Sequence, residues 1–226
     1  NTISQTTVLG IDLASDGITN NDAGDPDPGP NALQNFPTFT GAQTSANGYV
    51  AVQGALNSLA STTYRLDFYA APSGTTVREG RVYLGYTTVT TDASGNVSFK
   101  ATLSGTVATG GLISATATRM SGTGYAETSE FSAYQAATAM SVQTVTNTAS
   151  SGAGSLRAAI DAANAASGPT LIRFNIAGTG LHTITSDDML SISKQVIIDA
   201  STDDSYAAND NRPAIQIAGT SGNDER

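Results

Sequence analysis

The side chains best suited to chemistry lie in an acidic connector, residues 14–37, which contains the stretch SDGITNNDAGDPDPGPN. Calcium is bound in proteins by about six to eight oxygen ligands, and carboxylate and amide oxygens are its usual donors. Carboxylates crowded into a loop stiffened by proline repel one another, and a bound cation would relieve that repulsion. The sequence therefore predicts a structural Ca²⁺ site made by Asp16, Asn20, Asp22, Asp25 and Asp27.

The alternative for this connector is a solvated turn without an ion. Asp and Asn side chains often accept hydrogen bonds from their own main chain in such turns. The spacing also lacks the closing glutamate of an EF-hand loop. A second acidic stretch, DASTDDSYAANDN, is interpreted as a polar corner loop; it contains Asp199, Asp203, Asp204 and Asp210.

Residues that enzymes use for acid–base and nucleophilic catalysis are scarce. His182 is the single histidine, so a Ser-His-Asp triad would have to use it, and the chain has no G-x-S-x-G motif. Glu127 and Glu130 are expected to be surface charges that protect an edge strand rather than the carboxylate pair of a glycosidase. The chain has no cysteine, which excludes disulfides and thiol catalysis. We therefore expect no enzyme activity.

Composition and charge argue against two kinds of partner. The net charge of -9 and the pI near 4.3 disfavour a nucleic-acid ligand, and the basic residues form no stripe. The sequence has no run of about twenty apolar residues, so no membrane span is expected. An acidic chain poor in lysine, free of cysteine and rich in Thr, Ser and Gly indicates a bacterial secreted or cell-surface protein.

The elements that would position these residues change in character along the chain. Residues 1–13 predict short strands, which would need a neighbouring strand to be stable. Between residues 38 and 137, apolar and polar residues alternate in a series of strand-length segments, the last at 127–134. Turn sequences such as APSG, DASGN and SGTG separate them. Alternation with one apolar face at this spacing predicts a two-layer antiparallel sandwich.

The last third, residues 138–226, contains a convincing helix in the stretch GAGSLRAAIDAANAASGP. Ser155 is a suitable N-cap, and Gly168-Pro169 would end the helix. Its apolar residues share one face: Leu156, Ala159, Ile160 and Ala163. Short strands rich in isoleucine follow. This order predicts a coil-by-coil solenoid whose open end is covered by the helix.

Residues 144–185 resemble the start of a family of bacterial surface and secreted proteins, in which an SLR-x-AI-x-x-AN helix caps a right-handed parallel β-helix. CSLREA-type N-terminal segments are similar. The motif residues here are Ser155, Leu156, Arg157, Ala159, Ile160, Ala163 and Asn164, and Gly154 and Ala158 stand at the Cys and Glu positions of CSLREA. Residues 10–42 resemble the segment by which such proteins leave a β-helix and enter an immunoglobulin-like sandwich.

The resemblance implies an all-β chain with an Ig-like antiparallel β-sandwich over 38–137. The capped start of a right-handed parallel β-helix, with one short α-helix, would occupy 138–226. The implied function is a structural or adhesive module of a bacterial cell-surface or extracellular protein. Residues 1–13 would be the end of one β-helix, so the chain is expected to be a piece of a longer repeating protein or a subunit that stacks head-to-tail into fibres. Its partners would be adjacent repeats or other copies of itself.

The alternative function is a carbohydrate-binding or polysaccharide-cleaving β-helix module that contacts extracellular glycans. The candidates for stacking on sugars are Tyr69, Tyr83, Tyr125 and Tyr134. The basic residues available to a Ca²⁺-dependent lyase are Arg157, Arg173 and Lys194. Lys100 could instead form an intramolecular amide with Asn or Asp, but period-two counting from Phe99 places Lys100 toward solvent.

Overall fold

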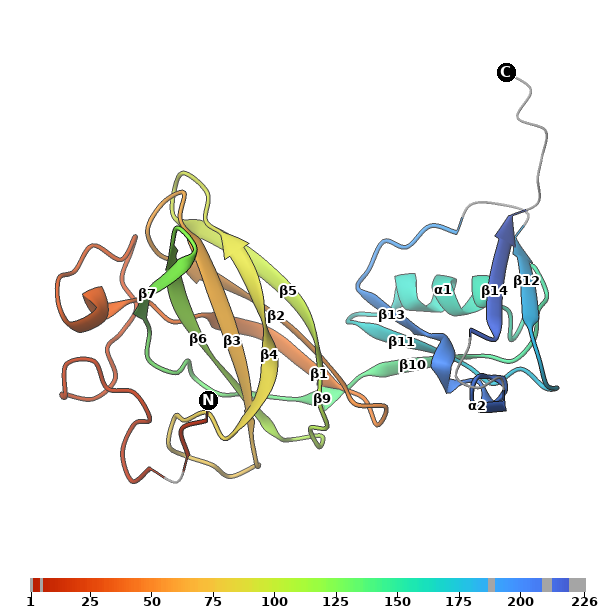
Figure 1. Ribbon diagram of the computed structural model, residues 1–226, viewed down its shortest axis with the longest axis horizontal. Coiled ribbons are helices and arrows are strands. Elements are labelled where there is room, and N and C mark those ends of the chain that lie inside the picture. The colour runs from red at the N-terminus through yellow and green to blue at the C-terminus, as the bar shows by residue number, and fades with distance from the viewer. Residues whose placement is uncertain (1, 5, 187–189, 209–212, 220–226) are drawn as a thin grey trace, which may run out of the picture. The chain divides into compact units, whose positions relative to one another are not determined.

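The computed structural model describes residues 2–4, 6–186, 190–208 and 213–219. The chain divides into two compact units, Asn1–Ala139 and Met140–Arg226. Both units are built mainly from β-strands, as the sequence predicts, and the α-helices of the described residues belong to the second unit (Figure 1). Each unit has its own hydrophobic core.

The first unit contains two sheets. One has the strand order β5-β2-β1-β9 and the other β4-β3-β6-β7, with β8 also paired to β6. The pairs are antiparallel except that β9 runs parallel to β1. The strands are β1 (Thr38–Thr44), β2 (Tyr49–Asn57), β3 (Thr63–Ala71), β4 (Val82–Thr90), β5 (Asn96–Ser104), β6 (Leu112–Ser121), β7 (Gly124–Thr128), β8 (Gln135–Ala136) and β9 (Thr138–Ala139).

The alternation of apolar residues decides which faces of these sheets meet. On β3, Tyr64, Leu66 and Phe68 are fully buried, while Arg65 and Asp67 between them lie on the opposite face. Both sheets contribute to one core, which includes Val50, Val52, Leu56, Phe99, Leu103, Ile113 and Ala115. The two sheets therefore pack on each other through a shared apolar interior, and Figure 1 shows them as two layers.

Gly54 on β2 marks a close approach between the strands. A Cβ atom there would lie 2.1 Å from the carbonyl oxygen of Thr38 and 2.5 Å from the ring of Phe99. The register of β1 shifts opposite this position, between Phe39 and Gly41. Glycine is thus required by packing, because any side chain would collide with main chain that cannot move aside.

The strand expected over residues 127–134 forms only in part, because β7 ends at Thr128. Beyond it, the N–H groups of Ser129 and Ser132 donate to the carbonyl oxygens of Ala117 and Ala115 on β6, at 2.9 and 2.8 Å. The two serine hydroxyls accept hydrogen bonds from the N–H groups of the same alanines. Side-chain oxygens therefore replace the main-chain acceptors of a regular strand.

The strands expected in residues 1–13 are not formed, and that prediction is wrong for the described part, 2–4 and 6–13. Ile3 makes an isolated antiparallel bridge with Gly80, and the N–H of Gly10 donates to the carbonyl oxygen of Arg78 at 2.9 Å. The segment belongs to the first unit, where Leu13 is buried. The loop before β4 is thus the partner that this short segment needs.

The acidic connector, residues 14–37, contains no strand or α-helix, as its glycines and prolines predict. Its one regular element is a short 3₁₀ turn, η1 (Pro30–Leu33). Phe36 and Pro37 at its end are buried, and β1 begins at Thr38. The connector therefore leads directly into the first strand of the sandwich.

The second unit is built from short parallel strands. One sheet contains β10 (Ser141–Val145), β11 (Thr170–Phe174) and β13 (Val196–Asp199), and another contains β12 (His182–Ser186) and β14 (Ile215–Gly219). The strands of each sheet are in step: Ile172 pairs with Ile198, and Ile184 pairs with Ile217. After β10 and α1, the chain therefore alternates between the two sheets from β11 to β14, and β13 and β14 each lie beside the previous strand of their own sheet.

Helix α1 (Leu156–Ala165) begins where the sequence predicts. The Ser155 hydroxyl accepts the N–H of Ala158 at 3.2 Å, and the predicted apolar face is buried. This face packs in one core with Val145, Ile172, Phe174 and Ile184. Two short elements, η2 (Ala200–Thr202) and α2 (Asp204–Ala208), lie between β13 and β14. Neither α-helix among the described residues has the length and apolar composition needed to cross a membrane.

Candidate functional site

The acidic connector brings together Asp22, Asp25 and Asp27. Their carboxylates each offer an oxygen, and these oxygens lie within 4.8 Å of one another. Asp16 and Asn20, the other predicted ligands, lie earlier in the connector and are exposed. The N–H of Asp16 donates to Asp12 Oδ1 at 3.2 Å, which forms a separate local turn. Of the predicted carboxylate ligands, the fold therefore groups Asp22, Asp25 and Asp27.

Asp25 is the buried member of this acidic group and anchors the connector. Its Oδ1 accepts the N–H of Asn35 at 3.1 Å, and its Oδ2 accepts Nε2 of Gln34 at 2.7 Å and the hydroxyl of Ser58. The Ser58 hydroxyl also lies 2.7 Å from that of Tyr64, a core residue of β3. These bonds join the connector to the end of β2 and to the interior of the sandwich.

The surroundings of Asp25 disfavour its charged form. Burial raises the pKa of Asp25, and hydrogen bonds from Ser58 and Asn35 oppose that rise. The nearby negative charges of Asp22 and Asp27 raise this pKa further. A cation beside the three carboxylates would favour ionisation, because it would offset both burial and repulsion.

Asp27 shows where such a cation would fit. Its Oδ1 is buried and has no hydrogen-bond partner within the described residues. Asp22 is exposed, and it is held through its main chain: its N–H donates to Asn35 Oδ1, and its carbonyl oxygen accepts Asn35 Nδ2. An unsatisfied buried carboxylate oxygen is costly. A cation or a water molecule at this place would satisfy it.

Two buried glutamates hold the N-terminal segment on the first unit. Glu130 Oε1 accepts the N–H of Leu13 and Oε2 accepts that of Thr19, each at 3.1 Å. Glu79 Oε2 accepts the N–H of Thr6 at 3.2 Å, and Arg81 donates to its other oxygen. Both carboxylates thus act as acceptors for main chain that lacks a sheet partner.

The prediction that Glu130 is a surface charge is wrong, because Glu130 is buried, with 2% of its surface exposed. Glu127 fits the expectation better: it is partly exposed and paired with Arg119. The sequence contains only a weak indication that Glu130 is buried. Glu130 stands between Ser129 and Phe131 in a stretch of low charge, but nothing local indicates that residues more than a hundred positions earlier would cover it.

His182 lies in a small polar cluster that is not a catalytic triad. Its Nε2 is 3.0 Å from Ser205 Oγ and 3.8 Å from Asp203 Oδ1, so both partners approach the same ring nitrogen. A triad needs the serine and the carboxylate at opposite nitrogens. Ser205 is also fully buried. The cluster therefore joins β12 to α2.

The described members of the second acidic stretch hold main chain. Asp203 Oδ2 accepts the N–H of Ile176 at 2.8 Å and Oδ1 that of Ser205 at 3.1 Å. Burial raises the pKa of Asp203, but these hydrogen bonds outweigh burial and hold the pKa below its ordinary value. Asp199 accepts the N–H of Ser201, and Asp204 is exposed. Asp210 lies outside the described residues.

The basic residues considered for lyase chemistry are found in structural contacts or at the surface. Arg157 donates to the carbonyl oxygen of Ser150 at 3.3 Å, as expected of a residue that holds a loop. Arg173 donates to the hydroxyl of Thr144 on the neighbouring strand at 2.9 Å. Lys194 is exposed. Lys100 is exposed on β5, as its position in the alternation predicts.

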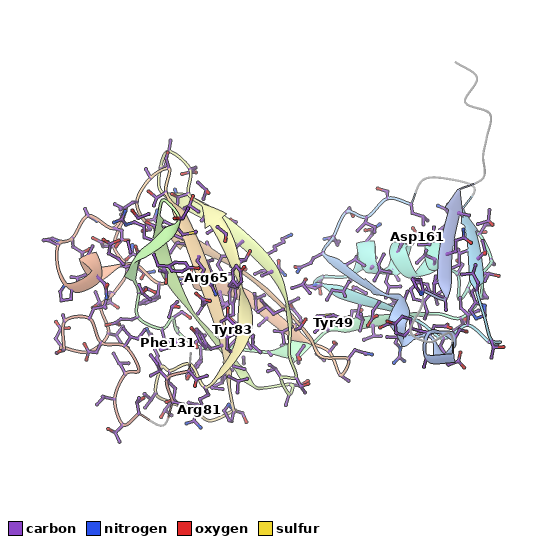
Figure 2. All side chains as sticks on the ribbon, viewed as in Figure 1. Tyr49, Arg65, Arg81, Tyr83, Phe131 and Asp161 are labelled. Atoms are coloured by element: carbon purple, nitrogen blue, oxygen red, sulfur yellow. The ribbon has the colours of Figure 1, made fainter. Side chains whose placement is uncertain are left out.

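The tyrosines considered for sugar contact separate into two groups. Tyr83 and Tyr125 are exposed on the sheet β4-β3-β6-β7, and Figure 2 shows Tyr83 near Arg65. Tyr69 is partly buried, with its ring 5.3 Å from that of Phe131. The Tyr134 hydroxyl donates to the carbonyl oxygen of Val77 at 2.8 Å, so Tyr134 holds a loop.

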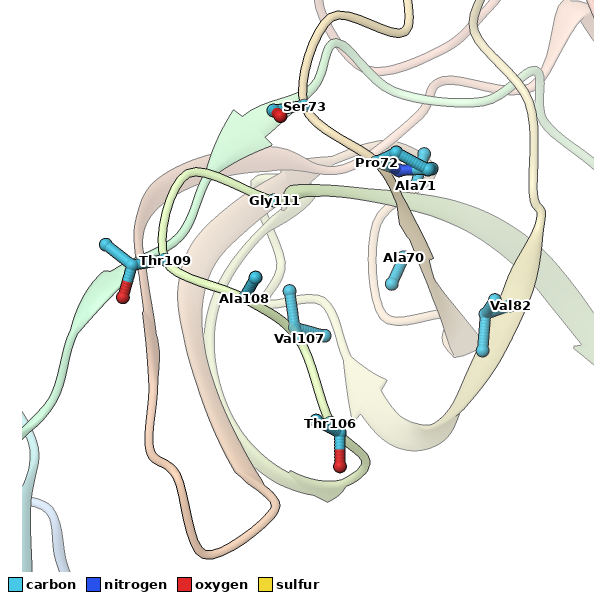
Figure 3. Close-up of a pocket in the computed structure, with 10 residues that line it drawn as sticks. All are labelled: Ala70, Ala71, Pro72, Ser73, Val82, Thr106, Val107, Ala108, Thr109 and Gly111. Carbon is cyan, nitrogen blue, oxygen red and sulfur yellow. The ribbon is translucent and has the colours of Figure 1, made fainter.

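A cavity of about 310 Å³ opens at the first unit (Figure 3). Apolar side chains make most of its wall: Ala70, Ala71, Pro72, Val82, Val107 and Ala108. The polar groups that line it are small hydroxyls such as those of Ser73 and Thr106, and no acid, base or aromatic ring is among its lining residues. Its lining therefore offers no group for acid–base chemistry.

The acidic group of the connector is thus the candidate metal site, and the sheet face with Tyr83 and Tyr125 is the candidate ligand surface. Neither site resembles a catalytic centre in its geometry. The chain was compared with protein-family models and with curated proteins, and neither comparison found a match.

Proposed function

We propose that this chain is a structural module of a bacterial cell-surface or extracellular protein. In this proposal an immunoglobulin-like sandwich, the first unit, precedes the helix-capped start of a right-handed parallel β-helix, the second unit. The strand pairing of the first unit supports the first part. In one sheet β2 lies between β5 and β1, and in the other β3 and β6 lie between β4 and β7, a division typical of Ig-like sandwiches.

The contacts of the SLR-x-AI-x-x-AN motif support the second part. Ser155 caps α1, and Ile160 enters the core. Arg157 contacts the loop before the helix and the hydroxyl of Ser186 at the end of β12. Asn164 holds a later loop, because its amide donates to the carbonyl oxygen of Ser191 and its oxygen accepts the N–H of Ser193, each at 2.8 Å. The motif therefore ties the helix to the loop before it, to the end of β12 and to the segment that precedes β13.

The observation that carries the proposal is a change of exposure between register partners. Ile172 and Ile184 are buried, whereas their partners on the next strands, Ile198 and Ile217, are 42% and 51% exposed. β13 and β14 also lie at the ends of their sheets as far as the structure describes them. A further coil, from the same or another chain, would cover these isoleucines and pair with both strands.

Stacking of a coil on β13 and β14 can be tested by sedimentation and negative-stain electron microscopy over a range of concentrations. We expect elongated assemblies that grow with concentration, and we expect Ile198→Lys together with Ile217→Lys to abolish them. The matched control is Val8→Lys, a change at an exposed apolar residue of the first unit. Assemblies that survive the double substitution, or a chain that stays monomeric throughout, would contradict stacking at these edges.

The fibres expected from the sequence require residues 1–13 of one copy to pair with the C-terminal coils of another copy. In the described fold these residues are held by Glu79 and Glu130 on the first unit. Fibres of that kind would first require the segment to leave these carboxylates. Stacking of a further coil on β13 and β14 alone does not require residues 1–13 to leave these carboxylates.

We also propose that the connector holds a structural Ca²⁺ ion between Asp22, Asp25 and Asp27. The buried oxygen of Asp27 and the mutual repulsion of the three carboxylates support this assignment. A ligand present at about a hundred times its dissociation constant stabilises a fold by about 2.7 kcal/mol. Added CaCl₂ should therefore raise the melting temperature relative to EDTA.

The fold separates Asp16 from this group, which provides a control for the calcium experiment. Asp22→Asn with Asp27→Asn should remove the Ca²⁺-dependent shift, whereas Asp16→Asn should retain it. A melting temperature that is the same in CaCl₂ and EDTA would discard the metal assignment.

A further inference from the structure

Three exposed tyrosines surround one arginine on the outer face of the sheet β4-β3-β6-β7. Tyr83, Tyr86 and Tyr125 are 39%, 56% and 62% exposed. Arg65 lies among them, with its guanidinium carbon 3.8 Å from the centre of the Tyr86 ring. It donates hydrogen bonds to the hydroxyls of Tyr83 and Tyr125 at 2.9 and 3.0 Å. One side chain thus holds three aromatic rings in place.

The strand register brings two of these rings to the same face. Asp67 pairs with Tyr86, and after a shift in register between Phe68 and Tyr69, Tyr69 pairs with Tyr83. The extra residue, Leu84, enters the core instead. Gly85 permits this bulge, because its φ of 134° is unfavourable for residues with a side chain. Tyr83 and Tyr86 can therefore both lie outside.

The electrostatics of this tyrosine face are balanced. Arg65 donates three hydrogen bonds to the Asp67 carboxylate, the shortest at 2.8 Å, and the Tyr83 hydroxyl donates to the same carboxylate at 2.9 Å. The positive charge of Arg65 is balanced by the negative charge of Asp67, so this ion pair presents no net charge to a ligand. The chain as a whole carries a net charge of -9, which repels polyanions.

The face also contains a hollow of suitable size. A cavity of about 400 Å³ is lined by Arg65, Asp67, Tyr69, Tyr83, Tyr125 and the hydroxyls of Thr118 and Thr128. Ligand sites of about 300–1,000 Å³ accommodate small organic ligands. The lining combines aromatic rings with several hydroxyl groups and one carboxylate, which can accept and donate hydrogen bonds at many angles.

We infer that this face binds a neutral oligosaccharide. The apolar side of a sugar ring would pack on Tyr86 or Tyr125, and sugar hydroxyls would bond Asp67, Thr118 and Thr128. A charged ligand is disfavoured, because Arg65 and Asp67 already neutralise each other. The inference does not rest on the proposed stacking function, since the two concern different units of the chain.

The first experiment is calorimetric and NMR titration of the full chain with cellohexaose, maltohexaose, xylohexaose and mannohexaose. Polygalacturonate serves as the anionic comparison. We expect saturable binding to at least one neutral probe, with amide shifts confined to β3, β4, β6 and β7. Absence of saturable binding to all four neutral probes, or binding to polygalacturonate alone, would overturn the inference.

The second experiment separates stacking from positioning. Tyr86→Ala removes a ring that makes no side-chain hydrogen bond in the described contacts, and should weaken binding about tenfold without unfolding the sandwich. Arg65→Met keeps every tyrosine but removes their common anchor, and should also weaken binding. Tyr125→Phe keeps the ring and should bind more tightly than Tyr125→Ala.

The matched control for the substitutions is Tyr206→Ala, which removes a tyrosine of α2 in the second unit. It should leave oligosaccharide affinity unchanged. If Tyr86→Ala and Tyr125→Ala both bind as tightly as the unaltered chain, the ligand lies elsewhere and the assignment to this face is wrong.

Discussion

Three buried carboxylates among the described residues accept hydrogen bonds from the N-terminal part of the chain. Glu79 accepts from Thr6, Glu130 from Leu13 and Thr19, and Asp25 from the main chain of Asn35. These segments have few strand partners, so their N–H groups would be unsatisfied when buried. Hydrogen bonds to a charged acceptor are worth more than neutral ones, about 1.5–3 kcal/mol. The main chain at Thr6, Leu13 and Thr19 therefore depends on carboxyl side chains as its acceptors.

Glu130→Gln tests this dependence with little change of shape. Gln keeps one acceptor oxygen but places an NH₂ group against a donor, so we expect a loss of about 1–3 kcal/mol in the free energy of unfolding of the first unit. Glu127→Gln is the control, because the partly exposed Glu127–Arg119 pair should contribute about 1 kcal/mol or less. Denaturant titration followed by circular dichroism measures both. Equal effects of the two substitutions would show that Glu130 is not an anchor.

Glu79 predicts a pH dependence at the N-terminal segment. Burial raises the pKa of Glu79, but hydrogen bonds from Arg81 and Thr6 outweigh burial, so its folded pKa lies below the ordinary value of 4.5. A carboxyl group whose pKa is lower in the folded state than in the unfolded state stabilises the fold at pH values above its unfolded pKa. This stability is lost as the pH falls through the folded pKa. The protection factors of the Ile3 and Thr6 amides in hydrogen exchange, which are corrected for the intrinsic effect of pH on exchange, should therefore fall below pH 4.5. The variant Glu79→Gln should lack that transition; if it keeps the transition, another group is responsible.

At the scale of the element, α1 shows how a local pattern and a tertiary contact combine. Ser155 caps the helix and also donates its hydroxyl to the carbonyl oxygen of Gly152 at 2.7 Å. One face of the helix is buried in the core of the second unit, while Asp161, labelled in Figure 2, belongs to the exposed face. The helix start is therefore fixed by its cap and its orientation by its apolar stripe.

The cap can be tested by Ser155→Ala. Loss of a serine N-cap costs about 0.5–2 kcal/mol, and burial of Ser155 places the expected value at the upper end. Asp161→Ala, in the same helix, should change the free energy of unfolding much less. Thermal unfolding followed at 222 nm compares the two variants. A stability change at Asp161 as large as that at Ser155 would argue against a specific role for the cap.

At the scale of the whole molecule, the chain contains two independent cores. Phe68 lies in the first core and Ile160 in the second. Substitution of buried Phe or Ile by Ala costs about 2–5 kcal/mol in the unit that contains the residue. The first core joins strands of two sheets, whereas the second joins parallel strands to α1.

Differential scanning calorimetry of the full chain should therefore show two transitions. Phe68→Ala should lower one of them and Ile160→Ala the other, because each core unfolds with its own unit. A single transition that both substitutions lower equally would mean that the units unfold together, contrary to the division into separate cores.

The amino-acid sequence by itself determined the features that follow from short-range patterns. Alternation predicts the strands from β1 to β6, since successive side chains of a strand point to opposite faces. The helical spacing from Leu156 to Ala163 and the cap at Ser155 predict α1 in the same way. Charge density and proline content predict an irregular connector. These features need no knowledge of distant residues.

Only the tertiary structure decided which polar residues are buried. Glu130 is covered by Leu13 and Thr19, more than a hundred residues earlier, and the strands expected at 1–13 give way to hydrogen bonds with such acids. The bulge at Gly85 likewise decided that Tyr86 joins Tyr83 on one face. These contacts depend on strand register and chain path, which a single sequence does not encode in any local pattern. Burial of a polar group is favourable only when a distant partner satisfies it, and that partner is known only once the chain has folded.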